Sequence, residues 1–163
     1  YTGGPYPLAY NGLGDLFVFI FFGGVATVGT YFVKAVQVTP EAFLAAVPAG
    51  GLITNILVVN NYRDIETDKE TNKQTLAVIL GETGSRIEYV ILLSVSYLTP
   101  IVFLILFDYS WIVLLPLLSL PFALQSVRKL YSGLQGTALN QVLAETARLS
   151  LLFALLFSIG IIL

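Results

Sequence analysis

The sequence NNYRDIETDKETNKQTLAV occupies residues 60–78, between two long apolar stretches. It carries seven charged side chains from Arg63 to Lys73, although only 11% of the 163-residue chain is charged and 56% is hydrophobic. A charged side chain at the centre of a membrane-spanning helix costs about 2.5–3.5 kcal/mol. The stretch is therefore predicted to lie in water, outside the apolar phase that the flanking segments need.

The rest of the chain contains five apolar segments, each long enough to cross a bilayer, which takes about 20 predominantly apolar residues. Backbone polar groups in lipid must be satisfied within the segment, and this requirement selects helices. The sequence therefore predicts an all-α, polytopic transmembrane helix bundle. The expected spans are residues 15–38, 41–62, 87–107, 110–130 and 141–163.

Prolines and glycines predict the shape and packing of these helices. Pro116 and Pro121 fall inside the fourth segment and predict kinks, because proline lacks the donor for the helical hydrogen bond. Small residues allow helices in a membrane to approach closely. We expect this packing role at Gly23, Gly24, Gly29, Gly50 and Gly51.

The basic residues predict how the bundle is oriented. Five spans place residues 1–14, 63–86 and 128–140 on one side of the membrane. Six cations fall on this side, namely Arg63, Lys69, Lys73, Arg86, Arg128 and Lys129, and only Lys34 falls on the other. Because cytoplasmic loops carry an excess of Lys and Arg, we expect residues 63–86 and 128–140 on the cytoplasmic face of the inner (plasma) membrane.

The composition also excludes several kinds of chemistry. The chain has no Cys and no His, so thiolate metal sites and the usual general base are excluded. Any metal must use oxygen ligands, which favour Mg²⁺, Mn²⁺ or Ca²⁺. The net charge of −2 gives no indication of a nucleic-acid partner.

The acids of the polar stretch recur at helical spacing. Asn60, Asp64 and Asp68 follow one another every four residues, so they share one face if the second span continues as a helix. Carboxylates and phosphate oxygens are usual Mg²⁺ ligands, and the pattern therefore suits Mg²⁺, or Mn²⁺, held between the protein and a diphosphate. Charge alone suits any solvated loop between spans, but it leaves this spacing unexplained. Glu66 and Glu70 lie off this face and are expected to be solvated.

This pattern resembles a known family. Asn60, Asp64 and Asp68, followed by Lys73, Thr75 and Leu76, are similar to the second aspartate-rich motif of the UbiA superfamily of intramembrane prenyltransferases. The opening YTGGPYPLAYNGLGD of residues 1–15 adds a resemblance to the branch that acts on 1,4-dihydroxy-2-naphthoate. The resemblance implies a nine-helix bundle with two aspartate motifs, of which residues 1–163 match the C-terminal part of a single domain. The first motif is absent here, so we expect the fragment alone to be inactive.

The resemblance also implies a reaction and roles for residues. A polyprenyl group would pass from polyprenyl diphosphate to 1,4-dihydroxy-2-naphthoate, giving demethylmenaquinol in menaquinone biosynthesis. The expected roles are catalytic for Asp64 and Asp68, metal-binding for both of these and Asn60, diphosphate-binding for Lys73 and Arg63, and substrate mouth for Tyr1, Tyr10 and Asp15.

Other interpretations stay open at this level. The acceptor could be 4-hydroxybenzoate, chlorophyllide, homogentisate or haem, as in other branches of the superfamily. An ion-coupled transporter fragment or a structural membrane subunit would also contain five spans. Glu145 and Arg148, three residues apart in the fifth span, fit either an ion pair between neighbouring turns or a contact between Arg148 and a ligand.

Overall fold

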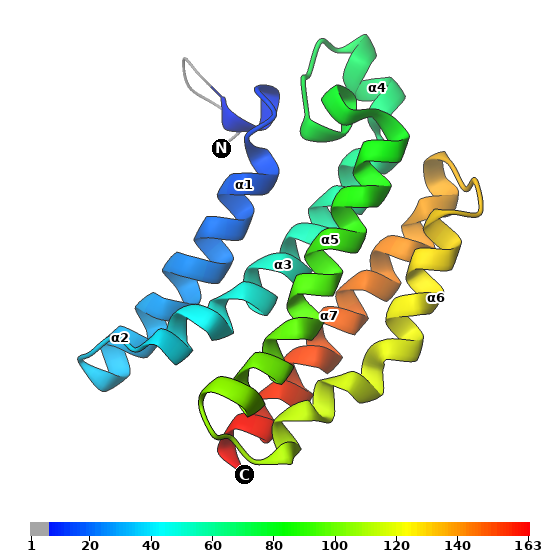
Figure 1. Cartoon of the computed structure of the whole chain (residues 1–163). Helices are drawn as coiled ribbons and strands as arrows, with labels where there is room; N and C mark the ends of the chain where they lie inside the picture. The colour runs from blue at the N-terminus through cyan, green and yellow to red at the C-terminus, as the bar shows by residue number, and fades with distance from the viewer. Residues whose placement is uncertain (1–6) are drawn as a thin grey trace.

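Five long apolar helices form the protein in a computed structural model, which describes residues 7–163 (Figure 1). The described residues form helices and no strand, and all five helices are long and apolar enough to cross a membrane. These candidate spans are Gly14–Ala35, Pro40–Arg63, Leu76–Leu106, Trp111–Leu130 and Gly136–Ile162. The predicted all-α bundle of five spans is confirmed.

The first span is continuous but changes its helical geometry twice. It consists of α1 (Gly14–Val18), the wider π-helical η2 (Phe19–Val28) and α2 (Gly29–Ala35). The chain then turns and enters α3 (Pro40–Arg63), which begins with Pro40 in its first turn and the Thr39 hydroxyl accepting a bond from the Ala42 amide at 3.3 Å. Such a cap satisfies one of the amides that have no partner in the first helical turn.

The polar stretch after α3 is more helical than the sequence predicts. It contains α4 (Ile65–Glu70), and α5 (Leu76–Leu106) begins eleven residues before the expected start at residue 87. The Thr75 hydroxyl caps α5 by accepting from the Val78 amide at 3.3 Å. Gly81 interrupts the helix with a φ of 68°, a conformation that glycine adopts readily. The prediction that residues 63–86 form a loop is therefore wrong. It relied on the length of the apolar segments, and this length does not show where a helix begins with a polar, capped turn.

The last two spans are joined by a short polar turn. The fourth span consists of the 3₁₀ helix η3 (Trp111–Ser119) and α6 (Leu120–Leu130), with Pro116 inside the first part and Pro121 at the start of the second. The short η4 (Gly136–Ala138) then leads into α7 (Leu139–Ile162). The two prolines therefore lie on either side of the change from 3₁₀ to α helix, and the kinks stay a prediction.

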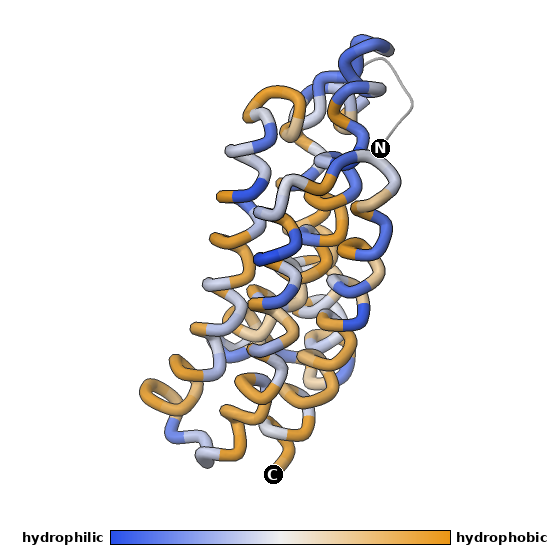
Figure 2. The backbone as a smooth tube through the Cα atoms, turned by 90° about the vertical axis from the view of Figure 1, so that its right-hand side faces the viewer, coloured by the Kyte–Doolittle hydropathy of each residue, from blue (hydrophilic) through white to orange (hydrophobic). Residues whose placement is uncertain are grey.

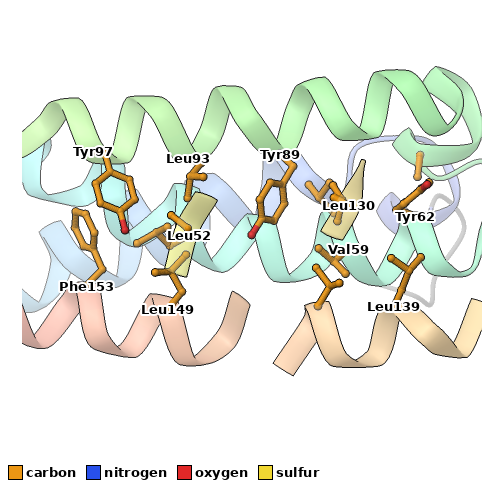
Figure 3. Close-up of a cluster of buried hydrophobic side chains, with 14 of the residues drawn as sticks. Leu52, Val59, Tyr62, Tyr89, Leu93, Tyr97, Leu130, Leu139, Leu149 and Phe153 are labelled. Carbon is orange, nitrogen blue, oxygen red and sulfur yellow. The ribbon is translucent and has the colours of Figure 1, made fainter. Parts of the chain in front are cut away.

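The hydrophobic core lies between α3, α5 and α7. In the most apolar part of Pro40–Arg63, 56% of the residues are buried, whereas in that of Gly14–Ala35 only 6% are. Helix α3 is therefore central, and the first span is peripheral. Figure 3 shows the core residues contributed by these helices and by α6. The labelled ones are Leu52, Val59, Tyr62, Tyr89, Leu93, Tyr97, Leu130, Leu139, Leu149 and Phe153. The rings of Tyr97 and Phe153 meet edge to face with centroids 5.1 Å apart.

A glycine contact holds the peripheral first span against α3. A Cβ atom added at Gly50 would lie 2.8 Å from the Phe19 carbonyl oxygen, and one at Gly23 would lie 2.7 Å from the Ala46 carbonyl oxygen. Both distances are too short for a side chain, so the two helices cross at this point only because both residues are glycine.

The predicted packing role is confirmed for three of the five glycines. Besides Gly23 and Gly50, a Cβ at Gly51 would lie 2.7 Å from the Ser96 hydroxyl on α5. The expectation is wrong for Gly24 and Gly29, where an added Cβ would have nothing within 4 Å.

The polar segments gather at one end of the bundle. The beginning of the described chain, α4 and the turn between α6 and α7 lie at the same end, and the C-terminus lies at the other (Figure 1). The backbone at this end, called here the α4 end, is also rich in hydrophilic residues (Figure 2). The grouping of the predicted loops on one side is therefore confirmed for the described residues.

Candidate functional site

The junction between α3 and α4 keeps the helical register of the acidic motif. The backbone amide of Asp64 donates to the Asn60 carbonyl at 3.2 Å, and that of Asp68 donates to the Asp64 carbonyl at 2.8 Å. Asp64 itself departs from helical geometry, with φ −100° and ψ 10°. The predicted spacing of one turn between the three residues is therefore present, although a bend at Asp64 divides the helix in two.

Arg63 binds the first two residues of the motif together. Its Nε and Nη2 donate to the two carboxylate oxygens of Asp64, each at 2.7 Å, and Nη2 also donates to Asn60 Oδ1 at 3.0 Å. Its Nη1 reaches Asn140 Oδ1 on α7 at 2.8 Å. A bidentate arginine–carboxylate pair is directional as well as strong, so Arg63 fixes the Asp64 side chain and ties the motif to α7.

Asp68 has a different cation. Lys73 Nζ lies 3.0 and 3.1 Å from the two carboxylate oxygens, and the Thr75 hydroxyl donates to Oδ2 at 3.4 Å. The Asp68 side chain is only 10% exposed. The three residues close the turn between α4 and α5, so Asp68 both carries charge and anchors the start of α5.

A small cavity of about 130 Å³ lies beside these pairs. Its walls come from the start of the first span, the last turns of α3 and the turn before α5. The lining residues are Ala9, Gly14, Asp15, Leu57, Asn60, Asn61, Lys73, Thr75 and Leu76. The cavity thus brings three predicted site residues together, namely Asn60, Lys73 and Asp15, from three separate parts of the chain.

The other predicted site residues lie outside this lining. Asp64 and Arg63 pair with each other beside it, and Asp68 reaches it only through Lys73 and Thr75. Tyr10 ends the short helix η1 (Leu8–Tyr10), is 41% exposed and does not line the cavity. Tyr1 lies outside the described residues.

Two cavity residues escaped the sequence-based site assignment. Asn61 is 5% exposed and donates from Nδ2 to Asp15 Oδ2 at 3.5 Å, and Thr75 is 3% exposed. Their signals are present in the sequence, since a second amide directly follows Asn60 at the end of a largely apolar span, and Thr75 occupies a capping position before an apolar run.

An apolar groove of about 510 Å³ lies next to the cavity. It is lined by Leu8, Phe17, Val18, Phe21, Phe22 and Leu57. Leu57 lines both spaces, so the polar cavity and the groove share a wall. The sequence alone did not indicate which aromatic residues surround a hollow, and the structure selects those on one face of the first span.

Glu145 and Arg148 do not form the ion pair that their spacing suggested. Glu145 Oε1 instead pairs with Lys129 Nζ at 2.5 Å and accepts from Gln141 Nε2 at 3.0 Å. Among the described residues Arg148 has no ion pair, and it lines a separate hollow between α6 and α7 together with Phe122 and Gln125. The ion-pair interpretation is therefore wrong, and the ligand alternative stays a prediction.

The donor atoms at the α4 end suit a hard cation. Within residues 7–163 no group of three or more acidic, His or Cys side chains converges on one point. The motif supplies carboxylate oxygens from Asp64 and Asp68 and an amide oxygen from Asn60, which are the ligand types that Mg²⁺ prefers. Mg²⁺ is usually held by one or two protein carboxylates together with substrate phosphates and water, so these donors fit a shared site.

Fold and site together define an all-helical membrane protein with an acid-bearing polar end above an apolar groove. The profile of the UbiA prenyltransferase family matches residues 1–152, and the chain belongs to that family.

Individual relatives give the same result. The chain is 40% identical over 155 residues to a 1,4-dihydroxy-2-naphthoate octaprenyltransferase of Mycobacterium tuberculosis, covering 95% of this chain and 52% of that protein. It is 37% identical over 162 residues to the Haemophilus influenzae protein of the same name, covering 99% and 53%. It is also 38% identical over 164 residues to the human UbiA prenyltransferase domain-containing protein 1, covering 100% and 46%. The chain spans about half the length of the curated relatives it matches.

Proposed function

We propose that the protein transfers a polyprenyl group from polyprenyl diphosphate to 1,4-dihydroxy-2-naphthoate. Diphosphate leaves the donor and the carboxylate of the acceptor leaves as carbon dioxide, which gives demethylmenaquinol for menaquinone biosynthesis. The observation that supports this most strongly is the 36–40% identity to several proteins named for that acceptor, over nearly the whole chain. The polar cavity beside an apolar groove supports it further, because the donor substrate joins an anionic head to a long apolar tail. We expect the 163-residue chain alone to be inactive, since it supplies only one aspartate motif.

Asp64 and Asp68, with Asn60 as a further ligand, are proposed to hold Mg²⁺, or Mn²⁺, together with the diphosphate. The bound ion would stabilise the negative charge on the departing diphosphate oxygens. Each carboxylate already has a cation from this chain, Arg63 or Lys73. These cations position the two carboxylates until substrate arrives.

Lys73 is better placed than Arg63 for the diphosphate. Lys73 lines the cavity while it pairs with Asp68, and its side chain is 24% exposed. Arg63 does not line the cavity, and its guanidinium is already bonded to Asp64, Asn60 and Asn140. We therefore assign the direct diphosphate contact to Lys73 and the positioning of Asp64 to Arg63.

The apolar groove is proposed to hold the first isoprene units of the donor. Phe17, Phe21 and Phe22 line it beside Leu57, the residue shared with the cavity. Aromatic faces attract cations, and apolar walls exclude water. These residues would thus protect the allylic cation that forms when the diphosphate departs.

The proposed setting is the bacterial inner (plasma) membrane, with the α4 end in the cytoplasm. Six of the eight Lys and Arg residues belong to the three segments that meet at that end. A cytoplasmic site would allow both soluble naphthoate and lipid-borne polyprenyl diphosphate to reach the cavity.

The test uses the full-length parent protein in membranes with Mg²⁺, a polyprenyl diphosphate and 1,4-dihydroxy-2-naphthoate. Wild type is expected to form a prenylated naphthol. Asp64→Ala and Asp68→Ala should each lower kcat/KM by on the order of a hundredfold or more, because the metal's contribution is several kcal/mol. Glu70→Gln, an exposed change on the same short helix α4, serves as the control and should keep full activity.

Three results would contradict parts of this proposal. Full activity in both aspartate variants would remove the metal assignment. Turnover of 4-hydroxybenzoate without turnover of the naphthoate would move the protein to another branch of its family. Ion movement without any prenylated product would favour the transporter alternative.

A further inference from the structure

Asp15 is a buried carboxylate whose hydrogen-bonding capacity is only partly used. It is 3% exposed and begins the first span beside Gly14. Its Oδ2 accepts from Asn61 Nδ2 at 3.5 Å, which is at the long limit for such a bond. Its Oδ1 is buried and has no hydrogen-bond partner among the described residues.

The surroundings of Asp15 also lack a neutralising partner. The described residues give it no ion pair, whereas Asp64 and Asp68 each have one at 3.0 Å or less. Leaving a buried charged acceptor without a partner costs more than the roughly 1–3 kcal/mol typical of a neutral group. A group kept in this condition is more typical of a functional site than of a packing position.

The cavity indicates what kind of ligand could satisfy Asp15. The carboxylate lines the same space of about 130 Å³ as Lys73, and Asn60 and Asn61 line it too. The ligands that meet here must supply an anionic group at the Lys73 wall, which the diphosphate does, and a neutral hydrogen-bond donor at the Asp15 wall. A diphosphate has no hydrogen-bond donor to offer Asp15, so the Asp15 wall needs a second ligand.

We propose that Asp15 accepts a hydrogen bond from a ring hydroxyl of the aromatic acceptor and thereby orients the ring. This inference rests on the proposed function and adds to it a residue that selects hydroxylated acceptors. Only the hydroxyl-bearing edge of the ring then enters the cavity at the Asp15 wall, and the Lys73 wall stays free for the diphosphate. A bond to a charged acceptor also raises the electron density of the ring, which favours attack on an allylic cation.

The experiment pairs an enzyme variant with a change in the ligand. Full-length parent protein and its Asp15→Asn variant are compared for KM of both substrates. Inhibition constants are then measured for two naphthoates, each lacking one of the two hydroxyl groups. Asp108→Asn is the matched control, because it makes the same chemical change at an exposed residue outside the cavity.

We expect the KM for 1,4-dihydroxy-2-naphthoate to rise by about tenfold in Asp15→Asn, because the charged hydrogen-bond acceptor becomes a neutral and weaker one. The KM for polyprenyl diphosphate should stay within about twofold, which a misfolded variant would not achieve. Wild type should bind one of the monohydroxy naphthoates more weakly than the dihydroxy compound by a similar factor. The Asp15→Asn variant should bind that monohydroxy naphthoate and the dihydroxy compound with similar affinity.

Other results separate failure of this inference from failure of the proposed function. An unchanged acceptor KM, or equal weakening for both substrates, would show that Asp15 has only a structural role. If wild type uses 4-hydroxybenzoate and not the naphthoate, the proposed acceptor is wrong. Wild type and Asp15→Asn are then compared with 4-hydroxybenzoate and with benzoate, which lacks the hydroxyl group. This comparison decides whether Asp15 binds an aromatic hydroxyl.

Discussion

The junction of α3 with α4 and the start of the first span hold their acids in opposite conditions. At the junction, Asp64 and Asp68 each pair with a cation nearby in the sequence, Arg63 or Lys73. At the first span, the only side-chain partner that residues 7–163 give Asp15 is the amide of Asn61, which lies 46 residues away in the chain. The difference indicates two roles. Carboxylates that already have a counter-ion suit the binding of a metal ion and a diphosphate, and a carboxylate without a counter-ion suits a neutral hydrogen-bond donor.

The largest expected effect comes from separating the two regions. Gly50→Val would put a side chain where a Cβ already lies 2.8 Å from the Phe19 carbonyl, so the first span must move away from α3. Overpacking of this kind costs about 1–3 kcal/mol, and it would displace Asp15 from the cavity while leaving the junction intact. Acceptor KM should rise more than polyprenyl diphosphate KM, as steady-state kinetics of the parent protein would show.

Gly24→Val is the matched control for this prediction. It makes the same change one residue after Gly23, where an added Cβ has nothing within 4 Å. Its kinetics and thermal unfolding should stay close to those of wild type. Equal effects in the two variants would mean that the glycine contact does not position Asp15.

The next effect concerns the pair at the junction. Lys73→Met removes the cation from Asp68, whose side chain is only 10% exposed, and leaves a carboxylate without its counter-ion. We expect a loss of about 2 kcal/mol in stability, less than for a fully buried pair. Adding Asp68→Asn should restore part of that stability in thermal unfolding, even though activity stays low. Additive losses would argue against direct coupling of the two residues.

The smallest effect tests the geometry of the Arg63 pair. Arg63→Lys keeps the charge but cannot make the two parallel bonds to Asp64 at 2.7 Å, nor reach Asn60 and Asn140 together. Activity should fall by about tenfold, the equivalent of one lost hydrogen bond to a charged group. Lys69→Gln, which removes a highly exposed pair with Glu66, should leave kcat/KM unchanged. A larger loss in Lys69→Gln than in Arg63→Lys would overturn this ranking.

Much of the fold could be predicted from the sequence because lipid imposes simple rules. Apolar length located all five spans, and charge placed the polar segments at one end. The start of α5 was missed, because the cap at Thr75 and the break at Gly81 carry a polar helix into an apolar one. The ion pair expected between Glu145 and Arg148 was also wrong, since Lys129 from the end of α6 takes the carboxylate.

The features of the site also differ in whether the sequence could predict them. The helical spacing of Asn60, Asp64 and Asp68 is a local property, and it was readable because four residues make about one turn. The partners of these residues, and the cavity that joins Asn60 and Lys73 to Asp15, depend on how separate helices pack.

The sequence by itself determined a bundle of five membrane-spanning helices, an acidic motif at its polar end and the family resemblance of that motif. Only the tertiary structure decided that Gly23 and Gly50 bring the first span against α3, and that this contact buries Asp15 beside Asn61. The physical reason is the distance along the chain over which each effect acts. Hydropathy and helical period act between neighbours in the chain, whereas a buried carboxylate acquires its surroundings from residues that only packing brings close.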